Sequence, residues 1–454
     1  MKVSNRLGFF AKKCMSSRRS IVAAVASMVV LSGLDPNPAA ADPLFGAPLS
    51  FDVGFHPECV AIGDFNGDGK PDLATANNGF FPGTVSVLLG NGDGTFAPKT
   101  DYEAAQQLTS SVAVGDVNRD GTLDLVATAF QAGESMMVFL GNGDGTFQPK
   151  IDLAGGGQSV AIGDLNGDGN LDLAAAGEFA DNQPAIVRLG NGDGTFQELR
   201  YLPAGEHPMS VAIGDLNSDG TADLVVADNA FSVWVFLWSP DGTNQSGTRF
   251  PTTTGSSTVN SVAIGDLNKD GKPDLAVGGD FSISVLLGNG DGAFGPPSEY
   301  ASRVSQHSRS IAISDLNWDG SSDVVVATSE VNYGGVLVRL GNGDGTLGPS
   351  TVYAAGWGPF SVAVGDFNRD GKPDVAAAGY ISTFIEQRVS VLLNIGSSPP
   401  VNFQLHPHQI RLGSRVTPVT GTIRVPAPYD ASQIDVASIR LNGKVTASSS
   451  RAPG

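Results

Sequence analysis

The chain is poor in cysteine, in basic residues and in long apolar runs, and each shortage excludes a class of protein. Its 454 residues contain two cysteines, Cys14 and Cys59, which is too few for a module stapled by disulfides. The 27 Lys and Arg residues are outnumbered by 46 Asp and Glu residues, and the formal net charge of −19 would repel nucleic-acid phosphates. No apolar run approaches the roughly 20 residues that a transmembrane helix needs. We therefore expect no nucleic-acid partner and no transmembrane segment.

What the chain does have is a repeated pattern of Asp, Asn and Gly. The nine-residue motif Asp-x-Asn-x-Asp-Gly-x-x-Asp occurs seven times, beginning at Asp64, Asp116, Asp164, Asp215, Asp266, Asp315 and Asp366. Successive copies begin 52, 48, 51, 51, 49 and 51 residues apart. A period near fifty residues is typical of propellers and solenoids rather than of one conventional core.

Each copy of the motif offers the oxygen atoms that a hard cation prefers. Asp, Asn and Asp at positions 1, 3 and 5 supply three side-chain oxygens, the Gly at position 6 permits a sharp turn, and position 7 supplies a carbonyl. The Asp at position 9 closes the loop, where an EF-hand would use a Glu at position 12. The motif therefore predicts about seven calcium (Ca2+) sites, each between two β-strands. The predicted ligands are Asp64, Asn66, Asp68, Asp72, Asp116, Asn118, Asp120, Asp124, Asp164, Asn166, Asp168, Asp172, Asp215, Asn217, Asp219, Asp223, Asp266, Asn268, Asp270, Asp274, Asp315, Asn317, Asp319, Asp323, Asp366, Asn368, Asp370 and Asp374.

The same residue types also suit a plain turn, because Asp, Asn and Gly favour turns without any metal. We prefer the metal, since a turn needs one or two such residues whereas all seven copies keep four side-chain ligands and the Gly. Three converging carboxylates would also repel one another without a cation. A second motif, Asn-Gly-Asp-Gly-Thr-Phe at 91–96 and in later repeats, has too few oxygen ligands for calcium and predicts a structural hairpin turn.

Each period has room for four short strands, which is the content of one propeller blade. Segments rich in β-forming residues flank the acidic loop, as at 210–214 and 223–227, and a third precedes the Asn-Gly turn, as at 85–89. The seventh period stops after its third strand, and residues 44–54 resemble the missing fourth strand. We therefore predict an all-β fold, a seven-bladed β-propeller of four-stranded blades, closed by an N-terminal strand and followed by a short C-terminal β segment.

The two ends of the chain differ from the repeats. Residues 1–41 combine six basic side chains, an apolar stretch from Ile21 to Leu34 and the small residues Ala39-Ala40-Ala41, which is the pattern of a signal peptide. Arg18-Arg19 keeps a twin-arginine route open beside the Sec route. We thus predict a secreted, periplasmic or cell-surface protein, with the propeller at 42–396. Residues 397–454 are predicted to form a linker and a partial β-sandwich-like segment.

The repeats also carry a family resemblance. The pattern Val-Ala-Ile-Gly-Asp-x-Asn-x-Asp-Gly-x-x-Asp-Leu, together with Leu-Gly-Asn-Gly-Asp-Gly-Thr-Phe, resembles bacterial FG-GAP or VCBS repeats, which are related to the propeller of integrin α chains. The resemblance covers residues 44–396 and implies a calcium-binding propeller. The family includes adhesins, lectins and polysaccharide-active enzymes, so the resemblance implies a fold and a metal rather than one activity. Unlike an integrin α chain, this sequence has an acidic loop in every repeat and no Arg-Gly-Asp.

Residues that break the repeat are the candidates for binding a ligand. Trp318 lies inside the sixth acidic loop and Trp357 lies in the connection to the seventh repeat, and these two are the better candidates for contacting a ligand. Trp234, Phe236 and Trp238 alternate onto one face of a strand, where they could stack on a sugar or pack between blades. We favour packing, but Trp238 is kept as a candidate ligand contact.

Histidine gives a weaker signal. His56, His207 and His307 each lie eight residues before the first Asp of an acidic loop, in equivalent connections. A catalytic or metal cluster would need these side chains within a few ångströms of one another. We prefer ordinary loop histidines and predict no catalytic residue.

Three functional hypotheses remain. We favour a calcium-binding extracellular scaffold for binding or adhesion, a monomeric propeller whose ligand is an extracellular protein or a glycan. A glycan-binding lectin would need aromatic or polar residues repeated in the connections between blades. A polysaccharide lyase or hydrolase would need a single set of acid, base and charge-neutralising residues in one cleft. No such set is visible in the sequence, because its carboxylates are assigned to metal, so we do not expect an enzyme.

Overall fold

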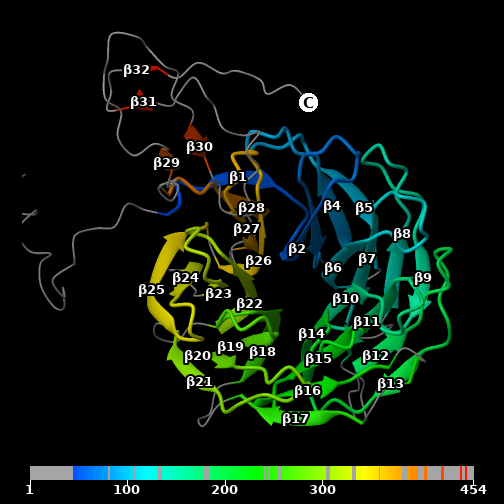
Figure 1. Cartoon of the computed structure of the whole chain (residues 1–454). Helices are drawn as coiled ribbons and strands as arrows, with labels where there is room; N and C mark the ends of the chain where they lie inside the picture. Colours follow the sequence, from blue (N-terminus) through cyan, green and yellow to red (C-terminus); the bar gives the residue numbers. More distant parts are fainter. Residues whose placement is uncertain are drawn as a thin grey trace, which may run out of the picture. The chain divides into compact units, whose positions relative to one another are not determined.

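The computed structural model contains seven four-stranded antiparallel sheets, arranged as the blades of a ring (Figure 1). The structure describes residues 44–396 except 80–81, 106–107, 131–134, 178–184, 240–241, 244–245, 253–257, 303–306, 330–333, 357 and 381–386. Beyond residue 396 it describes 403–405, 421–423, 440–441 and 445–446. Every helix or strand assigned in these ranges is a β-strand. The predicted all-β, seven-bladed propeller is confirmed.

Each blade runs from an innermost strand at the ring's centre to an outermost strand at its rim (Figure 1). The innermost strands are β2 (Pro57–Gly63), β6 (Thr109–Gly115), β10 (Ser159–Gly163), β14 (Pro208–Gly214), β18 (Val259–Gly265), β22 (His307–Ser314) and β26 (Pro359–Gly365). The second strands are β3 (Asp72–Asn77), β7 (Asp124–Ala129), β11 (Asp172–Ala176), β15 (Asp223–Asp228), β19 (Asp274–Gly279), β23 (Asp323–Ser329) and β27 (Asp374–Tyr380). The third strands are β4 (Thr84–Leu88), β8 (Ser135–Phe139), β12 (Ala185–Arg188), β16 (Ser232–Phe236), β20 (Ser282–Leu286), β24 (Gly335–Gly341) and β28 (Gln387–Leu392). The outermost strands are β5 (Thr100–Glu103), β9 (Ile151–Ala154), β13 (Arg200–Leu202), β17 (Thr248–Pro251), β21 (Ser298–Ala301), β25 (Leu347–Ala354) and β1 (Leu49–Asp52).

Blades 1 to 6 follow this order along the chain from β2 to β25, and blade 7 combines β26, β27 and β28 with β1. The start of the propeller therefore completes its last blade, as the sequence predicts. Phe45 forms an isolated bridge with Asn394, and the N–H of Ile395 donates to the carbonyl oxygen of Leu44 at 2.9 Å. Phe45 is buried and meets Tyr353 of blade 6 edge-on, with ring centroids 5.1 Å apart. This closure pairs the edge of β28, which would otherwise be exposed.

The hydrophobic core lies between the blades. Alternate side chains of a second strand face opposite neighbours: Ala74 and Ala76 of β3 pack with Val112 and Leu125 of blade 2, whereas Leu73 packs against blade 7. Seven such clusters are buried, one at each junction of neighbouring blades. A single sheet could not bury both of its faces, so the apolar stabilisation of each blade comes from its neighbours.

A ring of serine hydroxyls also links the innermost strands. Ser361 Oγ of blade 7 accepts a hydrogen bond from the backbone N–H of Val60 in blade 1 at 3.2 Å. Equivalent bonds join Ser111 to Val160, Ser159 to Val211, Ser210 to Val262, Ser261 to Ile311 and Ser310 to Val362. In blade 1 the same position is Cys59, whose Sγ instead donates to the carbonyl oxygen of Val112 at 3.7 Å. Six hydroxyls and one thiol therefore connect consecutive blades around the axis.

The predictions about the two ends of the chain fall mostly outside the described residues. The predicted signal peptide, residues 1–41, is not described, and neither is most of the predicted linker and sandwich-like segment, residues 397–454. Within the latter, β29 (Phe403–Leu405) pairs with β30 (Gly421–Ile423), and β31 (Arg440–Leu441) pairs with β32 (Val445–Thr446). A search of the described ranges for a helix long and apolar enough to cross a bilayer finds none.

Candidate functional site

The seven acidic loops connect each innermost strand to the second strand of its blade, and they share one backbone conformation. Position 4 and the Gly at position 6 have positive φ in every loop, for example 58° at Arg119 and 87° at Gly121. A Cβ atom added to Gly121 would meet nothing within 4 Å, so Gly is required there by its φ and not by crowding. The residues at position 4 are Gly67, Arg119, Gly167, Ser218, Lys269, Trp318 and Arg369.

Within each loop, backbone N–H groups hold the side chains at positions 1, 3 and 5. In blade 1, Asp64 accepts from Asp68 N at 3.1 Å through Oδ1 and from Gly69 N at 2.8 Å through Oδ2. Asn66 Oδ1 accepts from Asp68 N at 3.0 Å, and Asp68 Oδ1 accepts from Lys70 N at 3.0 Å. The contact between position 1 and the N–H of the position-6 Gly recurs in all the other loops. The loops therefore gather these oxygen atoms within one tight turn.

The remaining oxygen of the position-5 carboxylate has a donor side chain in six loops. In blade 1, Lys70 Nζ lies 2.9 Å from Asp68 Oδ2. In blades 2, 3, 4 and 6 the side-chain amide of the Asn at position 3 donates to this oxygen at 2.8 to 3.0 Å. In blade 7, Lys372 Nζ lies 3.9 Å from Asp370 Oδ2. Each of these loops thus places either a lysine ammonium group or the partly positive N–H of a neutral amide beside the carboxylate.

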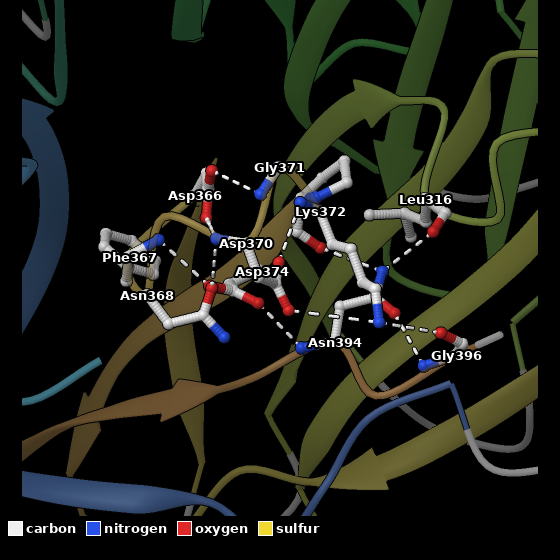
Figure 2. A network of polar contacts seen from close by, with 11 residues as sticks. Leu316, Asp366, Phe367, Asn368, Asp370, Gly371, Lys372, Asp374, Asn394 and Gly396 are labelled. Carbon is white, nitrogen blue, oxygen red and sulfur yellow. Dashed lines mark hydrogen bonds and ion pairs between the residues drawn. The ribbon is translucent and has the colours of Figure 1, made fainter. Parts of the chain in front are cut away.

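The carboxylate at position 9 lies behind the loop and is fully buried. In blade 7, Asp374 accepts from Phe367 N at 2.9 Å and from Asn394 N at 2.7 Å (Figure 2). The side-chain amide of Asn394 donates in turn to the carbonyl oxygen of Leu316 in blade 6 at 2.8 Å. The equivalent Asp in every other blade bridges its own loop to the end of the third strand in the same way. Position 9 therefore fixes each acidic loop to the body of its blade.

Burial of the position-9 carboxyls changes their titration. Desolvation raises the pKa to about 7 at Asp323 and to about 6 at Asp172, Asp223 and Asp374. The carboxylates at positions 5 and 1 of the same loop raise the pKa as well. Three carboxyl groups of each of these loops therefore lie within electrostatic reach of one another.

The chemistry of this donor set fits a hard cation, because Asp and Asn oxygens are the ligands that calcium prefers. In the part of the chain that the structure describes, however, no group of three or more His, Cys, Asp or Glu side chains is arranged to hold a metal ion. In blade 1 the oxygens of Asp64, Asp68 and Asp72 accept hydrogen bonds from backbone N–H groups or from a lysine. The loops thus bring the predicted ligands close together, and calcium itself remains a prediction.

The Asn-Gly-Asp-Gly turns lie at the same end of the blades as the acidic loops. In blade 1, Asp93 Oδ1 accepts from the Thr95 N–H at 3.0 Å, and Asn91 Nδ2 donates to Thr95 Oγ1 at 2.9 Å. The N–H of Gly94 donates to the carbonyl oxygen of Phe367 in blade 7 at 3.0 Å. These side chains stabilise a turn and a junction between blades, which matches the structural role that the sequence suggests.

The tryptophans that the sequence suggests as ligand contacts lie in different surroundings. Trp238 is 1 % exposed and packs with Phe236 in the cluster between blades 3 and 4. Trp234 is partly buried against the same cluster, so these side chains pack between blades. Trp238 is therefore a core residue in this structure and not an accessible ligand contact. Trp318 is half-buried at position 4 of the acidic loop in blade 6, and Trp357 lies outside the described residues.

His56 belongs to an aromatic stack that the sequence does not predict. Its ring centroid lies 3.9 Å from that of Tyr380, with an angle of 6° between the planes. Tyr380 stacks on Phe360 at 4.8 Å, and the guanidinium carbon of Arg309 lies 4.9 Å from the Phe360 centroid. Glu58 interacts electrostatically with both Arg309 and Tyr380. We call His56, Glu58, Arg309, Phe360 and Tyr380 the seam cluster, because they join blades 6, 7 and 1.

A shared position in the repeat could have revealed part of the seam cluster. Glu58, Arg309 and Phe360 each lie six residues before the first Asp of their loops. In all three blades the pairing of the innermost strand shifts by one residue at this position. The other two predicted loop histidines do not join the stack within the described residues: His207 is exposed, and the side chain of His307 is not described.

The fold and the loops together define a class, the β-propellers built from repeats with one acidic loop in each blade. The sequence model of the FG-GAP-like repeat matches residues 50–127, 128–175, 164–226, 218–277, 266–326 and 315–377. The chain therefore belongs to the FG-GAP-like repeat family. A sequence search of curated proteins gives no match.

Solved structures of other propellers are similar to this chain at low sequence identity. A lectin from Agrocybe aegerita that recognises non-reducing terminal N-acetylglucosamine is 23 % identical over 75 % of this chain and 86 % of its own, with a TM-score of 0.49. The BBS1N chain from a crystal structure of its complex with ARL6DN is 12 % identical over 77 % of this chain and 97 % of its own, with a TM-score of 0.53. The second similarity supports the fold alone.

Proposed function

We propose that this protein is an exported propeller, stabilised by calcium, that acts as an extracellular scaffold for binding or adhesion. The observation that carries the proposal is the uniform conformation of seven acidic loops, each with positive φ at positions 4 and 6 and with Asp, Asn and Asp oxygens held in one turn. A fold that needed only turns would not require four oxygen side chains in every copy.

Calcium would act on stability rather than on chemistry. Bound within a loop, it would neutralise the carboxylates at positions 1, 5 and 9, whose mutual repulsion opposes folding. In six loops a lysine or asparagine N–H group lies beside the position-5 carboxylate, where a bound calcium ion would bring more positive charge. Cys59, the one cysteine outside the predicted signal peptide, has no partner for a disulfide, so metal takes over the stabilising role.

A ligand would bind at the end of the blades opposite the acidic loops. The acidic loops and the Asn-Gly-Asp-Gly turns are nearly identical from blade to blade, which suits a structural role. The connections at the other end differ in length, from two residues between β19 and β20 to eight between β11 and β12. Variable connections on a rigid scaffold are where binding sites usually occur. The expected partner is an extracellular protein or a glycan.

Thermal unfolding of the full chain, with calcium and then with a chelator, tests the calcium proposal. We expect about seven bound ions per chain and a large fall of the melting temperature when they are removed. Bound metal is counted in the same sample. No bound ion and no change in melting temperature would contradict the proposal and leave the acidic loops as plain turns.

Export is tested separately in bacterial cells. The full chain should reach the periplasm or the medium, and a chain that lacks residues 1–41 should remain inside. Equal retention of both forms would contradict export without affecting the calcium proposal.

A further inference from the structure

Six of the seven innermost strands carry one irregular residue near the start of the strand, and β10 of blade 3 pairs without a shift. In those six strands the pairing with the second strand shifts at Glu58, Ser110, Met209, Asn260, Arg309 and Phe360. These positions are equivalent, so they encircle the axis at the end of the blades opposite the acidic loops. Bulges of this kind re-aim side chains and are frequent beside binding sites.

The arc of this circle in blades 6, 7 and 1 differs from the rest because its side chains are linked. The stack of His56, Tyr380 and Phe360 ends at the guanidinium of Arg309, 4.9 Å from the Phe360 centroid. A cation on an aromatic face is held in one orientation while its N–H groups stay free to donate. Arg309 is exposed. The stack therefore positions a guanidinium group at the mouth of the ring.

Among the described residues Arg309 makes no direct hydrogen bond or ion pair, and Glu58 acts on it only through longer-range electrostatics. Other arginines of the propeller do form hydrogen bonds: Arg188 donates to the carbonyl oxygens of Ala154 and Gln197, and Arg339 donates to those of Gly348 and Ala301. Those two arginines connect strands within one blade or between neighbouring blades. Arg309 makes no such hydrogen bond, so the N–H groups of its guanidinium are available to a bound group.

Two further polar atoms beside the seam cluster lack partners. Asn78 Oδ1 and Gln387 Nε2 are buried without a hydrogen bond. Both residues flank His56, because Asn78 N donates to its carbonyl oxygen at 2.8 Å and Gln387 Oε1 accepts from its N–H at 2.6 Å. Asn78 also donates to Glu58 Oε1 at 2.6 Å. An unpaired acceptor and an unpaired donor thus lie beside His56 and Glu58 of the seam cluster. Unpaired buried polar atoms in a native structure call for an explanation.

We propose that the seam cluster binds a single acidic sugar residue, whose carboxylate pairs with Arg309 and whose hydroxyl groups pair with Asn78 and Gln387 once these two buried side chains turn toward the ligand. A planar guanidinium matches a carboxylate with two parallel hydrogen bonds. Sugar hydroxyl groups both donate and accept, so they satisfy Asn78 Oδ1 and Gln387 Nε2 together, which a simple anion does not. The net charge of −19 disfavours a polyanion, which is why one acidic residue in an otherwise neutral glycan is the better ligand.

Burial raises the pKa of Glu58, and the Asn78 amide and the charge of Arg309 act in the opposite direction. A protonated Glu58 would donate to the ligand instead of repelling its carboxylate. This inference deepens the proposed function, because it names the ligand class and the place on the scaffold. It does not depend on calcium occupying the acidic loops.

The test is a titration of the full chain, in calcium, with glucuronate and galacturonate followed by ligand-observed NMR. Parallel titrations use glucose and galactose, acetate, and a short acidic peptide. Variants are Arg309→Ala, Arg309→Lys and, as a matched control on an outermost strand, Arg200→Ala. Arg200 is also exposed, but it makes a contact of 3.4 Å with the Gly242 carbonyl oxygen and lies in blade 3. The melting temperature and bound calcium of every variant are measured in the same samples, so that loss of fold or metal is distinguished from loss of the site.

We expect both uronates to bind and the neutral sugars to bind at least about tenfold more weakly, because a charge-assisted hydrogen-bond pair is lost. Arg309→Ala should weaken binding by about tenfold or more, Arg309→Lys should have a smaller effect, and Arg200→Ala should bind as the parent does. Absence of uronate binding would overturn the inference. So would equal binding of acetate, of neutral sugars or of the acidic peptide, or unchanged binding by a folded Arg309→Ala variant.

Discussion

At the scale of single residues, the ring of serine hydroxyls depends on the side chain at one repeated position of the innermost strands, the position of Ser361 in blade 7. Six blades place a hydroxyl there, and blade 1 places the thiol of Cys59. A thiol is a weaker hydrogen-bond partner than a hydroxyl. In this ring of hydrogen bonds between innermost strands, the bond between blades 1 and 2 is therefore the weakest.

Replacing Cys59 by Ser should complete the ring. Its hydroxyl would accept from the Val112 N–H, as Ser361 accepts from Val60, and we expect a gain of about 0.5–1.5 kcal/mol in the free energy of unfolding. Urea unfolding of the parent and the variant measures this change in the free energy of unfolding. Ser361→Ala is the matched control and should lose about 1 kcal/mol or more, because it leaves the Val60 N–H without its partner. A less stable Cys59→Ser variant would show that packing of the sulfur matters more than the hydrogen bond.

The position-9 carboxyls should make the metal-free protein sensitive to pH. Their folded pKa values, about 7 at Asp323 and about 6 at Asp172, Asp223 and Asp374, lie above the ordinary value of 3.8. Between these values the folded state binds more protons than the unfolded state, so stability must fall as pH rises from about 4 to about 7. We expect a lower melting temperature at pH 7.5 than at pH 5 in chelator.

Calcium should reverse that trend, because it competes with protons for the same carboxyls and binds more tightly as they ionise. Melting curves at both pH values, with and without calcium, measure this. As a control, Asp323→Asn should reduce the dependence on pH in chelator. A metal-free protein that becomes more stable from pH 5 to pH 7.5 would contradict the assignment of these pKa values to the folded state.

At the scale of structural elements, closure depends on a short segment at the start of the propeller. Phe45 is 3 % exposed and fills the junction between blades 6 and 7, whereas Leu49 of the adjoining strand β1 is 36 % exposed. We expect Phe45→Ala to lower the free energy of unfolding by about 3 kcal/mol, through lost apolar burial and a cavity. Leu49→Ala, the control in the same segment, should lose less than about 1 kcal/mol. Equal effects would mean that strand pairing, rather than the side chain of Phe45, holds the closure.

Much of this element structure could be predicted from the sequence, because the period and the acidic motif fix strand number and order. Residues 44–54 could be placed in blade 7 for the same reason: a repeat that lacks its fourth strand must find one elsewhere. The position-9 aspartates were harder, because spacing alone does not show that their oxygens face backbone N–H groups behind the loop. The shared repeat position of Glu58, Arg309 and Phe360 was visible in the sequence. The stack of the seam cluster could not be predicted, since it joins side chains from three blades whose proximity depends on ring closure.

At the scale of the whole molecule, seven equivalent loops should contribute in parallel. With calcium near 1 mM and a dissociation constant near 0.1 mM, each site would add roughly 1.4 kcal/mol, and seven sites about 10 kcal/mol. That sum is comparable to the whole stability of an ordinary domain. Removal of calcium should therefore unfold or greatly weaken the propeller, while loss of one site should be tolerated.

A single-loop variant tests this. Asp168→Ala in blade 3 removes the position-5 ligand and should reduce the bound calcium by about one ion per chain, with a loss near 1.4 kcal/mol. Asp193→Ala is the matched control, because Asp193 lies in the Asn-Gly-Asp-Gly turn of the same blade and accepts from the N–H and the hydroxyl of Thr195. It should leave the calcium count unchanged. Loss of all ions in Asp168→Ala would show that the loops are strongly coupled rather than independent.

The closure at blade 7 leaves the first and last residues of the propeller side by side. The N–H of Ile395 donates to the carbonyl oxygen of Leu44 at 2.9 Å, so the path of the chain around the ring begins and ends at one place. A ring with adjoining ends can be cut and rejoined: a short linker between these residues, with new termini opened in any connection between blades, would preserve every blade. The propeller should therefore tolerate circular permutation, because the position of its termini affects the order of the strands along the chain but not the structure of the blades.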